Sequence, residues 1–468
     1  MRRTIVLDVV GLTPLLLAHA PNLKALAARG AMRALTTVTP AVTTTVQSTF
    51  VTGKLPREHG IVGNGWYFRD LAEVWLWRQS NHLVNGEKIW DAAKRRDSSF
   101  TCAKLFWWYN MYSSADISVT PRPMYPANGR KLPDIYTYPS SLREDLQSEL
   151  GQFPLFRFWG PTADIECTRW IGQSALRVFE RQKPTLTLVY LPHLDYNLQR
   201  LGPSYAGVER DVAAVDAICG ELIEAAERAG AEVVVLSEYG ITEVSNPIHI
   251  NRALRQAGWL RVREELGRDQ LDAGASQAFA VADHQIAHVY VAQPELVPEV
   301  AQLLRSLPGV ERVLDDAGKR EMGLDHPRSG ELVAISNAQS WFTYYYFLQD
   351  DRAPDYARTV DIHRKPGYDP VELFVDPKIR MPKLRIAKRL AQKTIGMRYL
   401  MDVISLDASL VRGSHGRPTD RPEEGPLFIT SMPELLGPGP VKATDVKSLL
   451  LDHVMGRVAV TPAMGVLA

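Results

Sequence analysis

The sequence predicts an α/β fold with a mostly parallel sheet, interrupted by a smaller inserted unit. Apolar, β-branched runs alternate with segments that carry apolar residues at helical spacing, as in "TIVLD", "NLKALAARG" and "RALTTV", and this alternation is typical of βαβ units. The pattern changes over residues 266–360, where short strands, a helix and an aromatic cluster follow one another. We therefore expect a core over 1–265, an inserted α+β cap over 266–360, and a return to the core with a C-terminal segment over 361–468.

Each expected element has its own local pattern. In the core, "GEKIWDAAKRR" has helical spacing and "FTCAKLFWW" has strand character. "PTLTLVYLPHLD" predicts a strand, "GVERDVAAVDAICGELIEAAERAG" an amphipathic helix, and "AEVVVLSEYG" another buried strand. In the cap, "HVYVA", "VERVLD" and "GELVAISN" predict strands, and "ELVPEVAQLLRSLPG" predicts a helix.

Composition sets the broad class of the protein. The chain has 468 residues, of which 45% are hydrophobic and 23% charged, enough for a large domain and a smaller insertion. A formal net charge of +1 gives no reason to expect a nucleic-acid partner. The three cysteines have no C-x-x-C spacing, so we expect neither a disulfide framework nor a cysteine zinc site. A reducing, cytoplasmic location fits this cysteine usage.

The N-terminal stretch "MRRTIVLDVVGLTPLLLAHAP" has the arginines and apolar middle of a secretory signal. Asp8 lies inside that apolar stretch, where a translocated segment rarely carries a charge. We therefore interpret "TIVLD" as a first buried strand. No apolar run is long enough to span a membrane.

Three acids directly follow apolar runs. Asp8, Asp195 and Glu238 are expected at strand ends, and the carboxyl ends of parallel strands share one edge of a sheet. Converging carboxylates repel one another unless a divalent cation binds between them. The alternative for each acid is a helix cap or a side chain turned to water.

The segment "TPAVTTTVQSTFVTGKLPREHGIVGN" combines a proline, three threonines, a helix-compatible stretch and a glycine-rich loop. It suits a hydroxyl at a helix N-terminus, where backbone N–H groups favour anions. Metal coordination would lower the pKa of such a hydroxyl enough for attack on phosphorus. The alternative is a helix cap with threonines that merely turn the chain.

These motifs together resemble the alkaline phosphatase superfamily, in its nucleotide pyrophosphatase/phosphodiesterase and phosphonoacetate hydrolase branch. The matching pieces, in order, are "VLDVVG", "PAVTTTVQSTFVTG", "HGIVGN", "DYNLQRLGP", "SEYGI" and "GSHG". The resemblance implies a three-layer α/β sandwich. It also implies that Asp8 is a metal ligand, that Thr43 is the nucleophile and a metal ligand, and that Asp195 holds a second metal with His415. Gln47 lies near the position of a residue that contacts a substrate oxygen in this branch.

The sequence departs from the branch at three metal positions. Gln199 and Tyr239 stand where the branch has histidines, and Glu238 stands where it has aspartate. Oxygen-rich ligands favour Mn, Mg or Ca, although Zn is not excluded. The resemblance therefore implies one or two divalent ions bound by an altered ligand set.

Other histidines could supply the missing nitrogens. His193 is expected on the same strand as Asp195, facing the same side. His363, with Arg364 beside it, could bind a phosphate or the metal. His284 and His288 have helical ligand spacing, but "AHVYV" reads as a strand. For each of them, a structural histidine is the favoured interpretation.

We expect a metal-dependent hydrolase of a small phosphate or phosphonate ester, acting through a covalent Thr43 intermediate. Two alternatives stay open: a catalytically degenerate binding or scaffold protein on this fold, and a phosphoryl transferase. The aromatic cluster, which comprises Trp341, Phe342, Tyr344, Tyr345 and Tyr346, is a candidate lid that selects the substrate. The sequence does not indicate an oligomeric state.

A basic run covers residues 378–393, with seven Lys or Arg, no acid and interleaved apolar residues. The favoured interpretation is a solvated helix face. The alternative is contact with an anionic membrane surface or another anionic partner.

Overall fold

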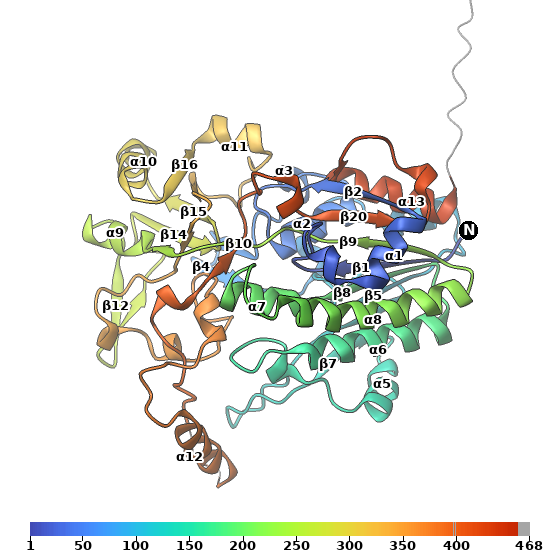
Figure 1. Cartoon of the computed structure of the whole chain (residues 1–468). Coiled ribbons are helices and arrows are strands. Elements are labelled where there is room, and N and C mark those ends of the chain that lie inside the picture. The colour runs from blue at the N-terminus through green and yellow to red at the C-terminus, as the bar shows by residue number, and fades with distance from the viewer. Residues whose placement is uncertain (396, 398, 457–468) are drawn as a thin grey trace, which may run out of the picture.

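The computed structural model describes residues 1–395, 397 and 399–456. Within these residues the chain forms an α/β core and, beside it, a smaller mixed unit with its own sheet (Figure 1). This arrangement confirms the predicted fold class. None of the described helices is long and apolar enough to cross a membrane.

The core sheet has nine strands among the described residues, in the order β21-β2-β20-β9-β1-β8-β5-β6-β7. Parallel pairs dominate its middle, where β1 (Thr4–Val9) lies between β8 (Leu186–Leu191) and β9 (Glu232–Leu236). β5 (Cys102–Leu105) and β6 (Ile117–Pro121) extend the parallel part. Every residue of β1 and β8 is buried, as expected for strands covered on both faces.

Antiparallel strands complete the two sides of this sheet. β7 (Ile135–Tyr138) pairs with β6. On the other side β20 (Leu427–Thr430) pairs antiparallel with both β9 and β2 (Ala31–Thr36), and β21 (Val441–Lys442) follows β2. The chain after residue 361 therefore contributes strands to the core sheet.

Helices cover both faces of the core sheet, which makes three layers. Ile5, Leu7 and Val9 of β1 pack in one apolar cluster with α1 (Pro21–Arg29), α6 (Ile165–Gln182) and α8 (Val208–Arg228). Val6 packs in another cluster with α2 (Thr43–Thr52), α4 (Ile89–Arg96) and α13 (Val446–Met455). Because side chains alternate along a strand, Asp8 shares the face of Val6 and points toward α2.

The smaller unit is built on a four-stranded antiparallel sheet. Its order is β14 (Ala278–Asp283), β15 (Ile286–Val291), β17 (Leu332–Ser336) and β16 (Val310–Leu314). The helices of this unit are α9 (Ile250–Gln256), α10 (Val297–Ser306) and α11 (Asp316–Met322). It also has two short strand pairs. In one pair β11 (Asn246–Ile248) lies beside β18 (Ser340–Phe342), and in the other β12 (Val262–Glu265) lies beside β13 (Arg268–Leu271). We call this unit the cap. Its sheet falls within 266–360, while α9 before that range packs into the same apolar cluster. The exact boundaries stay a prediction.

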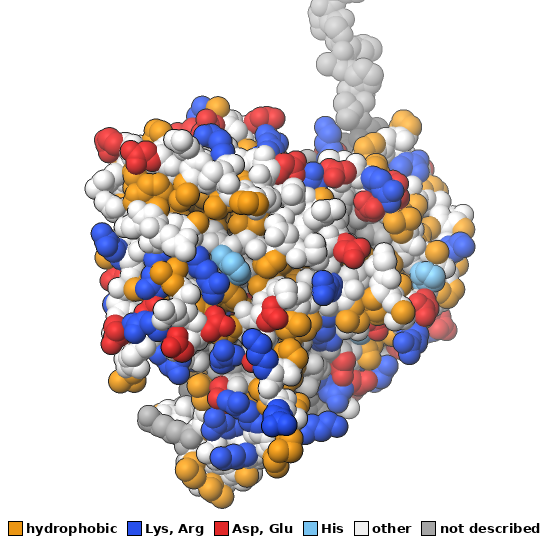
Figure 2. Space-filling model, turned by 60° about the vertical axis from the view of Figure 1, so that its left-hand side comes forward, with side chains coloured by type: hydrophobic (Ala, Val, Ile, Leu, Met, Phe, Trp, Pro, Cys, Tyr) orange, Lys and Arg blue, Asp and Glu red, His pale blue; other side chains and the backbone are white. Residues whose placement is uncertain are grey.

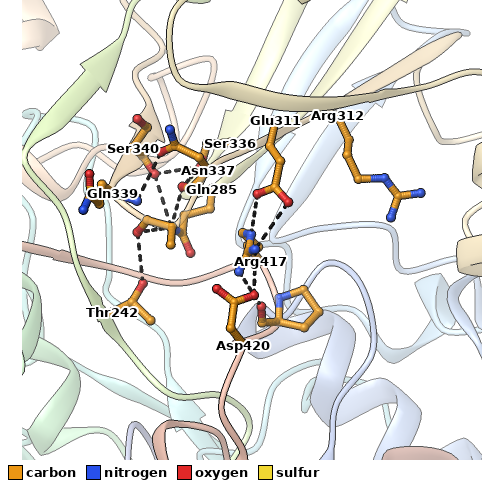
Figure 3. Close-up of polar contacts among 12 residues, drawn as sticks. Thr242, Gln285, Glu311, Arg312, Ser336, Asn337, Gln339, Ser340, Arg417 and Asp420 are labelled. Atoms are coloured by element: carbon orange, nitrogen blue, oxygen red, sulfur yellow. Dashed lines mark hydrogen bonds and ion pairs between the residues drawn. The ribbon is translucent and has the colours of Figure 1, made fainter.

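Polar contacts tie the cap to a core segment near residue 415 (Figure 3). Arg417 Nε donates to Glu311 Oε2 of β16 at 2.7 Å, and its Nη2 lies 2.8 Å from Asp420 Oδ1. Gln285, in the β14–β15 turn, donates through Nε2 to the carbonyl oxygens of Ala338 and Ser340 at 3.2 Å. The backbone N–H of Gln285 donates to the carbonyl of His415 at 2.9 Å. The cap is thereby held against the loop that carries a predicted site residue.

One predicted strand is shorter than expected. β8 ends at Leu191, and Pro192 precedes α7 (His193–Leu201). Asp195 therefore lies in the first turn of this helix, so the expectation that it ends a strand, with His193 on the same strand, is wrong. Proline is common at the start of a helix because its missing N–H needs no partner there, and "HLDYNLQRL" has the helical apolar spacing of Leu194 and Leu198.

The remaining elements are short or peripheral. They are α3 (Pro56–His59), the hairpin β3 (Gly65–Phe68) and β4 (Glu73–Leu76), α5 (Leu142–Leu150), the pair β10 (Thr242–Glu243) and β19 (Gly413–Ser414), and α12 (Pro382–Thr394). α12 projects from the body at the bottom of Figure 1.

Candidate active site

Five segments meet where the carboxyl ends of β1, β8 and β9 reach the N-terminus of α2. They contribute Asp8 on β1, Thr43 at the first position of α2, Asp195 on α7, Glu238 after β9, and His415 after β19. All five side chains are buried. The structure thus brings most of the predicted site residues together.

The first half of the site, which we call the Asp8 cluster, comprises Asp8, Glu238 and Gln47. The Gln47 amide donates through Nε2 to Asp8 Oδ2 at 3.1 Å and to Glu238 Oε1 at 2.7 Å. Its Oε1 accepts the backbone N–H of Trp108 at 2.7 Å, which fixes the amide with its NH₂ group toward the carboxylates. The other oxygens, Asp8 Oδ1 and Glu238 Oε2, are buried without a hydrogen-bond partner among the described residues.

Burial decides the protonation of the Asp8 cluster. Desolvation raises the pKa of Asp8 to about 7, and the contacts of Asp8 with the Glu238 carboxyl group and the Gln47 amide oppose this rise. Desolvation, followed by the charge of Asp8, raises the pKa of Glu238 well above its ordinary value. Two buried carboxyl groups in contact hold a proton between them unless a cation neutralises them.

The second half, which we call the Asp195 cluster, comprises Asp195, Gln199 and Tyr239. Gln199 Nε2 donates to Asp195 Oδ2 at 2.8 Å, and Tyr239 O–H donates to Asp195 Oδ1 at 3.3 Å. Tyr368 O–H donates to Gln199 Oε1 at 3.0 Å, which sets the orientation of that amide. Both oxygens of Asp195 therefore have donors, yet burial still raises the pKa of Asp195 to about 7.

Thr43 lies between the two clusters. Its Oγ1 is 3.0 Å from the Tyr239 hydroxyl oxygen, so a continuous hydrogen-bonded chain runs from Thr43 through Tyr239 to Asp195. The next residue, Thr44, is held in place because its N–H donates to Asn64 Oδ1 at 3.2 Å and its hydroxyl donates to the Gly63 carbonyl at 2.8 Å. The glycine-rich loop therefore positions the start of α2.

His415 belongs to a stack of four rings. Its ring lies 3.6 Å from that of Tyr239, at an interplanar angle of 6°, and 3.6 Å from the ring of His284. His284 in turn stacks on Tyr368 at 3.7 Å. Burial lowers the pKa of His415 to about 3. Its Nδ1 donates to the Ala41 carbonyl at 2.8 Å, because a carbonyl oxygen only accepts hydrogen bonds. The stack connects the cap turn that carries His284 with the core site.

A narrow cavity of about 70 Å³ opens onto Thr43, Asp195, Tyr239 and His415. Its other lining residues are mostly aromatic and come from distant segments: Trp77, Trp108, Phe158, Trp159, Tyr190, Pro192, Tyr196, His284, Ile362 and Tyr368. This aromatic wall was not predicted from the sequence. The only local signal was the density of aromatic residues in "VWLW", "FWWY" and "FRFWG".

Two predicted substrate-binding residues lie elsewhere. His363 and Arg364 are exposed, and Arg364 pairs with Asp361 at 2.6 Å. Within the described residues, the cavity wall includes neither of them. Their segment instead supports the site through Lys365, which is buried 2.7 Å from Asp369 Oδ2 and 2.8 Å from Glu372 Oε1.

The other histidines considered as nitrogen donors have structural contacts, which was the favoured interpretation. His193 Nε2 lies 3.4 Å from Asp211 Oδ1 on α8. His288 lies on β15, which confirms the predicted strand. Its Nε2 lies 2.8 Å from the Val62 carbonyl oxygen.

The aromatic cluster predicted as a lid is the core of the cap. Trp341, Phe342, Tyr344, Tyr345 and Tyr346 are all fully buried in the apolar cluster of that unit. The described lining of the cavity contains none of them, so the lid expectation is wrong. Large apolar side chains are usually buried, so a run of them is more typical of a packed core than of a lid.

The two clusters differ in their fit to a metal ion. In the described part of the chain, no three His, Cys, Asp or Glu side chains are grouped as ligands. The unpartnered Asp8 Oδ1 and Glu238 Oε2 nevertheless fit one hard cation. The Asp195 cluster does not fit a cation as it stands, because both carboxylate oxygens accept hydrogen bonds and the amide presents its NH₂ group.

Known proteins give a consistent picture. The family model for type I phosphodiesterase / nucleotide pyrophosphatase matches residues 4–369. A comparison with curated protein sequences finds no match.

Solved structures share the fold. Phosphonoacetate hydrolase from Sinorhizobium meliloti 1021, in complex with phosphonoformate, matches with a TM-score of 0.61 and 16% identity, covering 97% of this chain and 96% of that chain. Murine ectonucleotide pyrophosphatase / phosphodiesterase 5, in an inactive form with AMP, matches with a TM-score of 0.59 and 14% identity, covering 98% and 96%. The fold, the order of the motifs and the family match agree, and the chain therefore belongs to the type I phosphodiesterase / nucleotide pyrophosphatase family of hydrolases, in the alkaline phosphatase superfamily.

Proposed function

We propose that this enzyme hydrolyses a small phosphate or phosphonate ester with Thr43 as the nucleophile and with one divalent cation at the Asp8 cluster. The observation that carries the proposal is the chain of hydrogen bonds from Thr43 through Tyr239 to Asp195, three residues that line the aromatic cavity. It supplies a route by which a threonine hydroxyl loses its proton.

The chemistry follows from this chain of contacts. As the Thr43 Oγ–P bond forms, the Thr43 proton moves to the Tyr239 oxygen and the Tyr239 proton moves to Asp195. The pKa of Asp195, raised to about 7 by burial, suits a base near neutral pH. The ester P–O bond breaks, and the leaving group takes a proton from solvent.

The second step hydrolyses the covalent intermediate, and the proton transfer between Thr43 and Asp195 runs in the opposite direction. Water attacks phosphorus and its proton goes to solvent, the Thr43 Oγ–P bond breaks, and Thr43 recovers its proton from Asp195 through Tyr239. The positive end of the α2 dipole favours the anionic phosphoryl group in both steps, while the Thr44 N–H is already bound to Asn64 Oδ1.

The Asp8 cluster would hold the cation through Asp8 and Glu238. When bound there, a hard ion such as Mg or Mn supplies Lewis-acid stabilisation of the phosphoryl oxygens. Gln47 keeps the two carboxylates in place through the hydrogen bonds of its amide.

The cavity supports a particular class of substrate. Its aromatic walls favour an ester whose leaving group is flat and apolar. The related solved structures contain phosphonoformate and AMP, which supports a small-molecule ligand with a phosphoryl or phosphonyl group.

The test compares Thr43 variants on two chromogenic substrates, a diaryl phosphate and an aryl phosphonate ester. Thr43→Ala should lose about a thousandfold or more in kcat/KM, while Thr43→Ser should keep a measurable rate. Thr45→Val is the matched control, since its hydroxyl is buried without a partner among the described residues. A near-normal rate in Thr43→Ala would remove the nucleophile assignment.

The side-chain amide of Gln47 also favours a second candidate function, that of a catalytically degenerate binding protein. Gln47 supplies hydrogens to two carboxylates that would otherwise attract a cation. In that case the natural protein would bind the aryl ester without turnover, and Thr43→Ala would leave binding unchanged. A phosphoryl transferase would instead release the phenol faster when an acceptor alcohol is added.

A further inference from the structure

The segment that carries α12 is strongly basic. Between residues 377 and 401 the sequence has eight Lys or Arg and no Asp or Glu. α12 projects from the molecule in Figure 1, away from the candidate active site.

α12 attaches to the body through its arginines. Arg385 and Arg389 both pair with Asp402, with Arg389 Nη2 at 3.0 Å from Oδ1. Gln392 accepts a hydrogen bond from Arg389 at 3.1 Å, and Ile386 packs against the cap cluster. The inward residues 385, 389 and 392 follow helical spacing, so one side of α12 is committed to the body.

The opposite side of α12 is apolar and exposed. Leu384, Ala387, Ala391 and Ile395 continue one stripe at helical spacing, and Ile395 stays in helical register because its N–H donates to the Ala391 carbonyl at 3.2 Å. Leu384 is 60% and Ile395 72% exposed, and Met381 just before the helix is 63% exposed. Hydrophobic side chains form the tip of the lobe at the bottom of Figure 2, with Lys and Arg around them.

Free cations border this apolar stripe. Lys383 and Lys388 are exposed on its two sides, and Lys378 and Arg380 precede it. In the part of the chain that the structure describes, none of these four has an ion-pair partner, whereas the two inward arginines do. The basic run is thus divided into an attached half and a free half.

These features identify the partner by its chemistry. A second copy of the chain is disfavoured, because a two-fold interface would bring two acid-free basic segments face to face. An apolar stripe bordered by free lysines matches the boundary between anionic headgroups and acyl chains. We propose that α12 and Met381 dock this protein onto an anionic membrane surface.

The test is sedimentation of the full chain with vesicles, which needs no catalytic turnover. The natural protein should bind vesicles that contain about one third phosphatidylserine at least tenfold more tightly than pure phosphatidylcholine vesicles, and salt should weaken this binding. Thr43→Ala should bind equally well, so the result is independent of the proposed hydrolysis.

Two double variants separate the contributions. Leu384→Gln with Ile395→Gln should weaken binding about tenfold or more through the apolar stripe, and Lys383→Gln with Lys388→Gln should do so through charge. Leu266→Gln, at a fully exposed leucine in the β12–β13 turn, is the matched control and should change nothing. All these positions are exposed, so circular dichroism and ester hydrolysis should stay normal.

Three results would overturn the proposal. One is no binding of the natural protein to anionic vesicles, and another is binding that both double variants leave unchanged. The third is a dimer, measured by light scattering, that Leu384→Gln with Ile395→Gln dissociates, because a second copy would then cover the stripe.

Discussion

The Asp8 cluster and the Asp195 cluster solve the same problem in different ways. In each, a buried glutamine amide donates to carboxylate oxygen, and another group fixes the orientation of that amide. The Asp195 carboxylate is fully occupied by Gln199 and Tyr239, whereas the Asp8 cluster keeps two unpartnered oxygens. A buried carboxylate needs hydrogen donors or a cation. We therefore propose proton transfer at the Asp195 cluster and cation binding at the Asp8 cluster.

The largest expected effect comes from breaking the Asp8 cluster. Asp8→Asn together with Glu238→Gln removes both charged ligands and should lower kcat/KM by about a thousandfold or more and abolish stoichiometric binding of Mn. Elemental analysis and steady-state kinetics measure the two effects. Asp195→Asn is the contrasting variant and should keep its metal content. If Asp195→Asn lost the metal and the double variant did not, the roles of the clusters would be reversed.

Tyr239→Phe cuts the link between Thr43 and Asp195. It should lower kcat by about a hundredfold or more with little change in KM or metal content, because only proton transfer is lost. Tyr344→Phe is a suitable control, since its hydroxyl is buried in the cap core without a partner within the described structure. Equal rates in Tyr239→Phe and the natural enzyme would exclude the proton route.

The pH dependence sharpens the same contrast. Asp195 must be ionised to accept a proton, so kcat/KM should rise with pH up to its pKa of about 7 and then level off. In metal-free protein the free energy of unfolding should change in the opposite direction. Between about pH 4 and 7 the folded state keeps the Asp195 proton and the unfolded chain does not, so the free energy of unfolding should fall by about 1–4 kcal/mol as the pH rises through this interval. Urea unfolding at several pH values, with Asp195→Asn for comparison, measures this. A stability that rises over that interval in the natural protein alone would contradict the raised pKa.

The smallest expected effect is a change in metal preference. Gln199→His and Tyr239→His together introduce nitrogen donors at the Asp195 cluster, and Glu238→Asp places an aspartate in the Asp8 cluster. The triple variant should shift the ratio of zinc-supported to manganese-supported activity about tenfold toward zinc. The absolute rate should stay low because Tyr239 is gone. An unchanged ratio in a titration with both ions would mean that other residues set the preference.

The local sequence was sufficient for most of the core. β1, β8 and β9 are buried on both faces and read as continuous apolar runs, and α8 has a clear helical period, so their patterns need no tertiary information. The order of the motifs also led to the candidate nucleophile Thr43 and to the altered positions 199, 238 and 239. Each strand, helix or motif depends on residues a few positions apart, and the order of the motifs along the chain is read directly from the sequence.

Only the tertiary structure decided how those residues are used. The bonds from Gln47 to Asp8 and Glu238 cross 39 and 191 positions of sequence. The aromatic cavity gathers side chains from nine separate segments. Asp195 lies on a helix and not on the predicted strand, because β8 ends before Pro192. The aromatic cluster that was predicted as a lid lies in the core of the cap. The basic run was recognisable in the sequence, but its orientation depended on contacts in the folded chain. Arg385 and Arg389 pair with Asp402, and Ile386 packs against the cap cluster, so the apolar stripe stays outside. Periodicity records which residues share a side of an element, whereas the partner of that side is set by packing between segments that are far apart in the chain.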